Sequence, residues 1–196
     1  MTKRRIGKAR TLILLGISGS GKDTQARFLL QALSHSRNFS TGDAFRAIAK
    51  KRNLIGGYIK RILDQGGLVP YWGAVHTWLA DFFVRLRLDE HLVFSGSPRT
   101  IQEAEMLDDV MRDIGRSLPV GIYLKLPESV ARQRLFRRAR FDDNRRAIAG
   151  RFRFFRAHVQ PVIKFYRRRG RLITINGDQP VPAVWRDIRR MLRLRG

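Results

Sequence analysis

Residues 16–24, GISGSGKDT, have the types and the spacing of a loop that holds phosphate groups. The segment follows an apolar run and opens a helix-forming stretch, the context in which the pattern Gly-x-x-x-x-Gly-Lys binds phosphate. Glycines such as Gly16 and Gly21 let backbone N–H groups close around phosphate oxygens, and the helix N-terminus adds partial positive charge. Lys22 is in place to reach the outer phosphates of a nucleoside triphosphate. The segment predicts a phosphate-binding loop.

Residues 94–100, FSGSPRT, have the outline of a second phosphate-binding turn, with one departure. The position before Gly96, where such a turn is expected to carry an acid, is Ser95. A neutral hydroxyl is a much weaker partner for a hydrated dication than a carboxylate is. The chain therefore uses another acid, transfers phosphate without one, or no longer catalyses.

Short apolar runs alternate with helical patterns along the chain, and these elements must position the two loops. The runs that read as buried strands are 11–16, 91–95, 120–125 and 171–175, with a shorter one near 38–40. Apolar residues spaced three and four apart predict helices over 101–114 and 184–192, and 141–155 begins with the helix starters Asp and Asn. Strands alternating with helices predict an α/β fold with a parallel sheet covered on both faces.

The charge of the chain is unusual for a protein of 196 residues. Forty Lys and Arg oppose 16 Asp and Glu, which gives a net charge of +24, and 32 of the basic residues are arginine. Between Arg132 and Arg171, 14 arginines are opposed only by Asp142 and Asp143. Such a surface attracts polyanions, including nucleotides, RNA and DNA. The alternative is compositional drift that leaves guanidinium groups on solvated helix faces, and charge alone does not decide between them.

Composition excludes several classes of protein. Cysteine is absent, which excludes disulfides and thiol chemistry. No apolar run approaches the roughly 18–20 residues that span a bilayer. The start is basic and then apolar, like a secretion signal, but its apolar part is only Leu12–Leu15 and a glycine-rich loop follows. We therefore expect a cytoplasmic protein that makes no membrane contact and acts as a monomer.

Several ordered segments resemble those of adenylate kinases and related nucleoside monophosphate kinases, over nearly the whole chain. GISGSGKDTQARFL resembles their phosphate loop, which normally reads GxPGSGKGTQ. The other similar segments are STGDAFR (40–46), GGLVP (66–70), SGSPRTIQEA (95–104, family DGFPRTxxQA), RLFRRARFDDN (134–144) with Arg151, and INGD (175–178). The resemblance implies a three-layer P-loop NTPase fold with a central parallel five-stranded sheet flanked by helices. It also implies one domain, 1–196, with a basic tail at 1–10, an NMP-binding flap at about 41–70 and a short lid at about 137–143.

The resemblance implies where a triphosphate donor, ATP, would be held. The donor residues it implies are Gly16, Gly19, Ser20, Gly21, Lys22, Asp23, Thr24, Arg134, Arg138 and Gly177. Arg134 would pack against the donor base, Arg138 would reach the phosphates, and Gly177 would offer a backbone contact beside the base.

A nucleoside monophosphate would be held on the other side. The acceptor residues implied by the resemblance are Thr41, Arg46, Gly67, Leu68, Val69, Gly96, Ser97, Pro98, Arg99, Glu103, Arg140 and Arg151. Lys22, Arg99, Arg140 and Arg151 would be the catalytic group, because phosphoryl transfer requires positioning and neutralisation of charge on the transferred group.

Asp23 is a candidate for the acid that Ser95 lacks. In the resembled family the residue before GFPR is an aspartate that orients the Mg²⁺ water shell. Here Asp23 follows Lys22 directly, in the position where other P-loop enzymes place a Mg²⁺-ligating hydroxyl. We predict that Asp23 acts on Mg²⁺, directly or through water. The alternative is that Asp23 only favours the first turn of the helix.

Glu103 replaces the glutamine that reads adenine in the resembled family. An ionised carboxylate only accepts hydrogen bonds, so it suits adenine's amine but not its N1, whereas guanine has donors on N1 and N2. Thr41 resembles the adenylate-type pocket and favours AMP. AMP is therefore the predicted acceptor, with GMP as the alternative, and Glu103 as a plain surface residue stays open.

The sequence leaves two functions to be distinguished. The leading hypothesis is a Mg²⁺-dependent nucleoside monophosphate kinase that transfers the γ-phosphoryl group of ATP to AMP. The alternative is a catalytically weakened nucleotide-binding protein whose basic surface docks on RNA or another polyanion, and the two can coexist.

Overall fold

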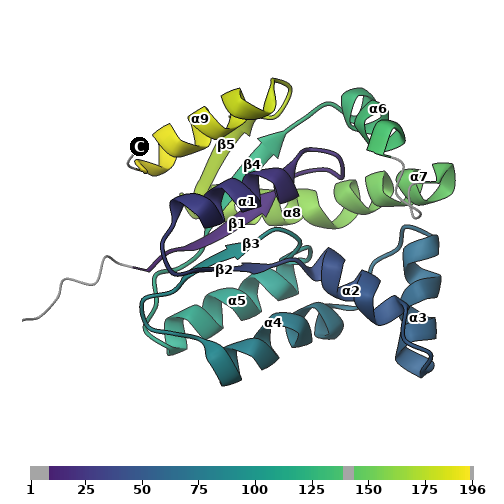
Figure 1. Ribbon diagram of the computed structural model, residues 1–196, viewed down its shortest axis with the longest axis horizontal. Helices are drawn as coiled ribbons and strands as arrows, with labels where there is room; N and C mark the ends of the chain where they lie inside the picture. Colours follow the sequence, from purple (N-terminus) through teal and green to yellow (C-terminus); the bar gives the residue numbers. More distant parts are fainter. Residues whose placement is uncertain (1–8, 139–143, 195–196) are drawn as a thin grey trace, which may run out of the picture.

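A five-stranded parallel sheet forms the middle of the molecule (Figure 1). The computed structural model describes residues 9–138 and 144–194. The strands are β1 (Thr11–Leu15), β2 (Ser36–Phe39), β3 (His91–Phe94), β4 (Val120–Lys125) and β5 (Leu172–Asn176). Their order across the sheet is β2-β3-β1-β4-β5, and every neighbouring pair is parallel. The predicted fold class is confirmed.

Helices cover both faces of the sheet (Figure 1). Those of the described residues are α1 (Lys22–Ala32), α2 (Thr41–Ala49), α3 (Leu54–Asp64), α4 (Tyr71–Arg85), α5 (Ile101–Asp113), α6 (Glu128–Arg138), α7 (Arg145–Phe154), α8 (Gln160–Arg168) and α9 (Val181–Leu192). Ile13 and Leu15 pack into a core with α4, α5 and α8, whereas Leu12 and Leu14 pack into another with α1 and α9. Because both faces of β1 are covered, its sequence is a continuous apolar run rather than an alternating one.

A third, smaller core holds the segment predicted to be the acceptor flap. Phe45, Ile59, Val69 and Ala74 pack together away from the main cores. They come from α2, from α3, from the chain that leads into α4, and from the first turn of α4 itself. In Figure 1, α2 and α3 lie at one end of the sheet, beyond its strands. The segment predicted to be the flap thus has a small core of its own.

Helix α7 continues into α8 through one π-helical turn, Phe155–Val159. The side chain of Asn144 caps α7 by accepting a hydrogen bond of 2.8 Å from the backbone N–H of Ala147, which agrees with the predicted helix start. The predicted tail and lid fall largely on residues 1–8 and 139–143, which lie outside the described residues. Within the described ranges, no helix has both the length and the apolar character needed to cross a bilayer.

Candidate active site

The loop between β1 and α1 is shaped by its glycines. Gly19 has a φ of 87°, and a Cβ atom there would lie 2.8 Å from the backbone oxygen of Ala131 on α6. Only glycine allows both this conformation and this close approach. Gly21, with a φ of 91°, is the N-cap of α1, and no side chain caps that helix. The N–H groups of the first turn therefore point into the loop without a side-chain acceptor, which suits an anion.

Lys22 lies inside this loop rather than in solvent. Its Nζ atom donates hydrogen bonds of 2.9 Å to the carbonyl oxygen of Gly16 and 3.0 Å to that of Ile17. Burial lowers the pKa of Lys22 to about 8, with a further lowering from the cationic Arg99 and Arg138 and an opposing effect of Asp23. A bound phosphate would favour the charged form, so this lysine is prepared to receive an anion.

The turn after β3 presents Arg99. The peptide bond between Ser97 and Pro98 is cis, and Arg99 Nε donates a hydrogen bond of 2.6 Å to the carbonyl oxygen of Gly96. Burial lowers the pKa of Arg99 from its usual value. The guanidinium groups of Arg151 and Arg46 lower it further, while carboxylates oppose them. Arg99 is therefore surrounded by cations from two other elements, an arrangement that a bound polyphosphate would stabilise.

Glu103 holds this turn together from inside the protein. It is fully buried, so the surface alternative is wrong. One carboxylate oxygen accepts hydrogen bonds of 2.7 Å from Ser97 Oγ and 2.9 Å from the backbone N–H of Arg99. The backbone N–H of Glu103 in turn donates to Thr100 Oγ1, which caps α5. Burial raises the pKa of Glu103, and the hydrogen bonds from Ser97 and Arg99 oppose that rise.

The two loops open onto one cavity of about 680 Å³. The predicted site residues that line it are Gly16, Gly19, Gly21, Lys22, Asp23, Thr24, Arg46, Gly67, Gly96, Pro98, Arg99, Arg134, Arg138 and Arg151. They come from segments that are far apart in sequence, from the first strand to α7. The volume suits small-molecule ligands of nucleotide size.

Other predicted residues lie behind the cavity wall or outside the described chain. Those not among the lining residues are Ser20, Thr41, Leu68, Val69, Ser97, Glu103 and Gly177. Five of these side chains are buried, so they support the wall rather than form its surface; they are Ser20, Thr41, Val69, Ser97 and Glu103. Arg140 lies outside the described residues.

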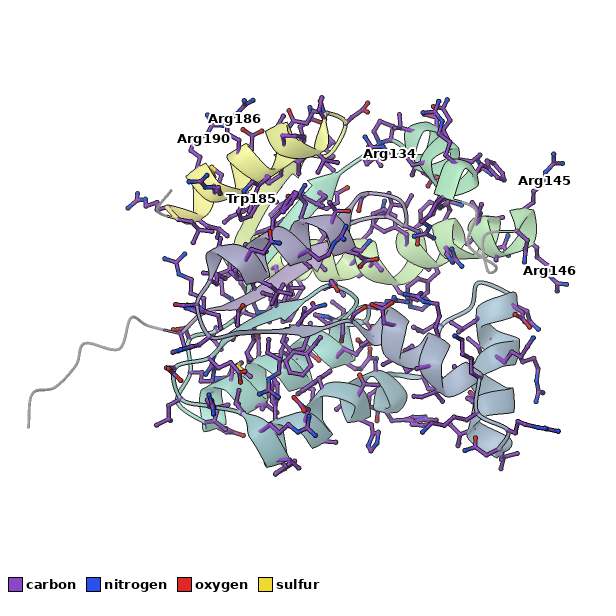
Figure 2. All side chains as sticks on the ribbon, viewed as in Figure 1. Arg134, Arg145, Arg146, Trp185, Arg186 and Arg190 are labelled. Atoms are coloured by element: carbon purple, nitrogen blue, oxygen red, sulfur yellow. The ribbon has the colours of Figure 1, made fainter. Side chains whose placement is uncertain are left out.

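The predicted donor-base residues lie together even though only Arg134 lines the cavity. Arg134 Nη1 donates a hydrogen bond of 3.1 Å to the carbonyl oxygen of Gly177, and its Nη2 lies 3.8 Å from a carboxylate oxygen of Asp178. The backbone N–H of Gly177 donates to the carbonyl oxygen of Lys125 at 2.8 Å. The loop after β5 is thereby fixed beside α6, and Figure 2 shows Arg134 at this edge of the molecule.

The residues predicted to hold the acceptor are tightly assembled. A Cβ atom on Gly96 would lie 2.5 Å from Thr41 Oγ1, so the turn after β3 touches the start of α2. Within the described chain, Thr41 Oγ1 is buried and has no hydrogen-bond partner. Arg46 forms an ion pair with Asp43 one turn earlier on α2. Asp43 also lines the cavity. It belongs to the STGD segment, which is the signal that could have identified it, but it is not among the predicted site residues.

Aromatic residues form a wall that sequence reasoning missed. Phe45, Phe154 and Phe155 line the cavity. Phe45 belongs to α2, and the other two lie where α7 meets the π turn. Nothing in the sequence signalled this role, because helical periodicity does not separate a core face from a cavity face.

The oxygen atoms near the phosphate loops are compatible with Mg²⁺ bound largely through water. Ser95 lines the cavity, and its buried Oγ has no hydrogen-bond partner within the described residues. Asp23, exposed at the start of α1, adds a carboxylate to the same cavity. No group of three or more carboxylate or imidazole side chains able to hold a metal occurs in the described part of the chain. Mg²⁺ keeps several waters and uses one or two carboxylates plus substrate phosphates, so this sparse set fits it.

The fold and the site define an α/β P-loop protein whose cavity gathers cations and backbone N–H groups around space for phosphate groups. The sequence profile of adenylate kinases matches residues 14–171. The adenylate kinase of Nitrobacter winogradskyi is 35% identical over 195 residues, covering 94% of each chain. That of Leuconostoc mesenteroides is 32% identical over 184 residues, covering 94% of this chain and 97% of its own. The chain therefore belongs to the adenylate kinase family of phosphotransferases.

Proposed function

We propose that this protein transfers the γ-phosphoryl group of ATP to AMP, giving two molecules of ADP. The observation that carries the proposal is the convergence of Lys22, Arg46, Arg99 and Arg151 on one cavity from four separate elements. Arg46 is paired with Asp43, but the repulsion that Arg46 and Arg151 exert on Arg99 still favours an anion of high charge among these cations. A donor triphosphate facing an acceptor monophosphate is such an anion.

The proposed roles follow from position. The backbone N–H groups at the start of α1 and Lys22 hold the β- and γ-phosphates of the donor. Arg46 holds the acceptor phosphate from the flap side, while Arg99 and Arg151 neutralise charge on the group in transfer. Because the transition state disperses charge over the equatorial oxygens, this fixed set of donors accelerates the reaction by electrostatic stabilisation.

AMP is the proposed acceptor, and the placement of Glu103 supports it. GMP was favoured only if the Glu103 carboxylate, which accepts but does not donate hydrogen bonds, faces the base of the bound monophosphate. Glu103 instead accepts hydrogen bonds from Ser97 and Arg99 inside the turn, where it is fully buried. The relatives named adenylate kinase are consistent with AMP. We therefore propose that Glu103 positions Arg99 and does not read the acceptor base.

Mg²⁺ is the proposed cofactor, and it would supply charge neutralisation to the donor phosphates when bound. Asp23 would hold it through its waters, with the hydroxyl of Ser95 as a further oxygen partner. Asp23→Gly is then expected to weaken Mg²⁺ dependence, measured as the Mg²⁺ concentration at half-maximal turnover. Unchanged dependence would reduce Asp23 to a residue that favours the helix start.

The proposed enzyme is a cytoplasmic monomer. The absence of cysteine suits a reducing compartment.

The test is ADP formation from ATP and Mg²⁺, with AMP, GMP, CMP and UMP supplied separately at equal protein concentration. Turnover with AMP well above the other three is expected. Preference for GMP would return Glu103 to the base-reading role. ATP binding without turnover on any acceptor would establish instead that Ser95 marks a lost catalytic centre.

A further inference from the structure

We propose that the exposed face of the helix formed by α7, the π turn and α8 binds the phosphate backbone of a nucleic-acid duplex, without reading its bases. This face is called the basic stripe. It is defined by eight exposed residues: Arg145, Arg146, Arg153, Arg156, Lys164, Arg167, Arg168 and Arg169.

The basic stripe is nearly free of acids. Residues 144–170 contain nine Lys and Arg and no Asp or Glu. Within the described residues, the one carboxylate paired with the stripe is that of Glu128, which lies 2.5 Å from Arg156 Nη1. Solvated helix faces more often carry both signs of charge, which stabilise a helix through pairs three or four residues apart. A face with one sign lacks those pairs and repels itself, so a polyanion would stabilise it.

The basic stripe is separate from the catalytic cavity. Arg151, on the same helix, lines the cavity, but none of the eight stripe residues does. Figure 2 shows Arg145 and Arg146 pointing away from the body of the protein at one end of α7. A polyanion on the stripe and nucleotides in the cavity can therefore be bound at the same time. The stripe is not explained by ATP or AMP recognition.

The length of the stripe matches a duplex. Arg146 and Arg167 are 21 positions apart in the sequence. At a rise of 1.5 Å per residue they are about 30 Å apart along the helix, close to one turn of B-form duplex. A duplex carries one negative charge per roughly 1.7 Å of its axis, so a cationic face of this length lies close to several phosphates. Seven of the eight side chains are arginine, whose guanidinium group binds phosphate through two hydrogen bonds at once.

The chemistry of the stripe favours a duplex over a single strand or a membrane. Single-strand binding uses exposed aromatic rings as stacking platforms, but Phe152, Phe155, Phe165 and Tyr166 are buried. Phe154 lines the cavity, and the exposed His158 ring is already stacked on it. A membrane-surface helix inserts an apolar face into lipid, but here the apolar face packs into the core of the protein. What remains exposed offers charge and hydrogen-bond donors to a regular row of phosphates.

The experiment measures binding of the whole protein to a fluorescent 20-base-pair duplex by anisotropy, from 50 to 200 mM salt. We expect the logarithm of the binding constant to fall with the logarithm of salt concentration with a slope of about −5 to −7, because about six to eight phosphates are neutralised. A single strand of the same length and anionic lipid vesicles are measured in parallel. Tighter binding to either would overturn the assignment to duplex.

A matched pair of variants separates the stripe from net charge. Arg153→Glu/Arg167→Glu changes the stripe, and Arg186→Glu/Arg190→Glu makes the same charge change on α9, where Figure 2 shows both side chains pointing outward. The stripe variant is expected to bind at least tenfold more weakly, with a slope smaller by about 2. The α9 variant is expected to lose less than threefold, and both keep kinase turnover. Equal losses of duplex affinity in the two variants would show that net charge alone governs binding, and would overturn the assignment of the basic stripe as the binding surface.

Discussion

The loop after β1 and the turn after β3 occupy equivalent places in the sheet but are built differently. The two strands are parallel neighbours, with Leu12 opposite Val93, so both connections leave the same edge. The loop after β1 is shaped by glycine backbone, and its helix has no side-chain cap. The turn after β3 is held by side chains, because Thr100 caps α5 and Glu103 accepts hydrogen bonds from Ser97 and Arg99.

This difference explains what each connection offers a ligand. The uncapped loop keeps its N–H groups available to phosphate, with Lys22 as the added charge. The turn uses internal hydrogen bonds to hold Arg99 at a fixed place, and it also presents the Ser95 hydroxyl, which has no hydrogen-bond partner within the described residues. We therefore expect substitutions at glycines to damage the loop after β1. In the turn after β3, we expect the damage at Glu103, the residue whose hydrogen bonds hold it together.

The largest expected effect is at the charge of the first loop. Lys22→Met should lower kcat by about 10²–10³-fold, because it removes a fixed donor to the transferred phosphate in a water-excluded site. Lys60→Met is the control, since Lys60 is exposed and forms an ion pair with Asp64 on α3. Steady-state ADP formation measures both. A loss of less than tenfold at Lys22 would mean that the backbone alone holds the donor.

The next effect tests the backbone of the same loop. Gly19→Ala should destabilise the protein by about 1–3 kcal/mol and weaken ATP binding, because it combines a strained φ with contact on the Ala131 backbone. Gly115→Ala is the control, since Gly115 has a φ of 69° but open space around it. Urea unfolding and ATP titration measure the two changes. Equal destabilisation would show that strain, and not packing against α6, requires glycine here.

A smaller effect is expected in the turn after β3. Glu103→Ala leaves the Arg99 N–H and the Ser97 hydroxyl without their acceptor, at a cost of about 1–3 kcal/mol. The KM for AMP should rise about tenfold as Arg99 loses its position, with a smaller change in the KM for ATP. Glu105→Ala, exposed on the same helix, is the control. A changed preference among AMP and GMP, with unchanged stability, would contradict the positioning role.

The fold could be predicted from the sequence because its signals are local. Each apolar run bounded by polar residues or glycine became a strand of the sheet, within one or two residues of the expected ends. The Asn144 cap and the glycine spacing of the first loop were equally readable, since each depends on residues a few positions apart.

The inner arrangement of the site could not be predicted in the same way. The sequence indicated that Glu103 replaces a glutamine, but not that Ser97, six residues earlier, supplies a donor that turns the carboxylate inward. That contact depends on the fold of the turn. The aromatic wall from Phe154 and Phe155 likewise depends on how α7 and the π turn lie against the cavity.

The last expected effect concerns the proton on Lys22. Burial lowers the pKa of Lys22 to about 8, so its charge is lost as pH rises through that value in the free enzyme. Because kcat/KM reports the free enzyme, kcat/KM for ATP should fall above pH 8, by about tenfold at pH 9. The phosphates of ATP are already ionised there and do not contribute to the change.

Loss of the same proton changes the free energy of unfolding in the opposite direction to kcat/KM. This contrast distinguishes the titration of Lys22 from a general loss of structure at high pH. In the unfolded chain Lys22 keeps its proton up to a pKa of about 10.4, so between pH 8 and about 10 the unfolded state binds more protons. Its contribution to the free energy of unfolding therefore rises with pH in this range, while kcat/KM falls. Lys22→Arg should abolish both trends, because arginine stays charged. If the pH profiles of kcat/KM for the wild type and for Lys22→Arg are both flat, the prediction is wrong. Phosphate binding at the first loop then depends on backbone geometry more than on the protonation of Lys22.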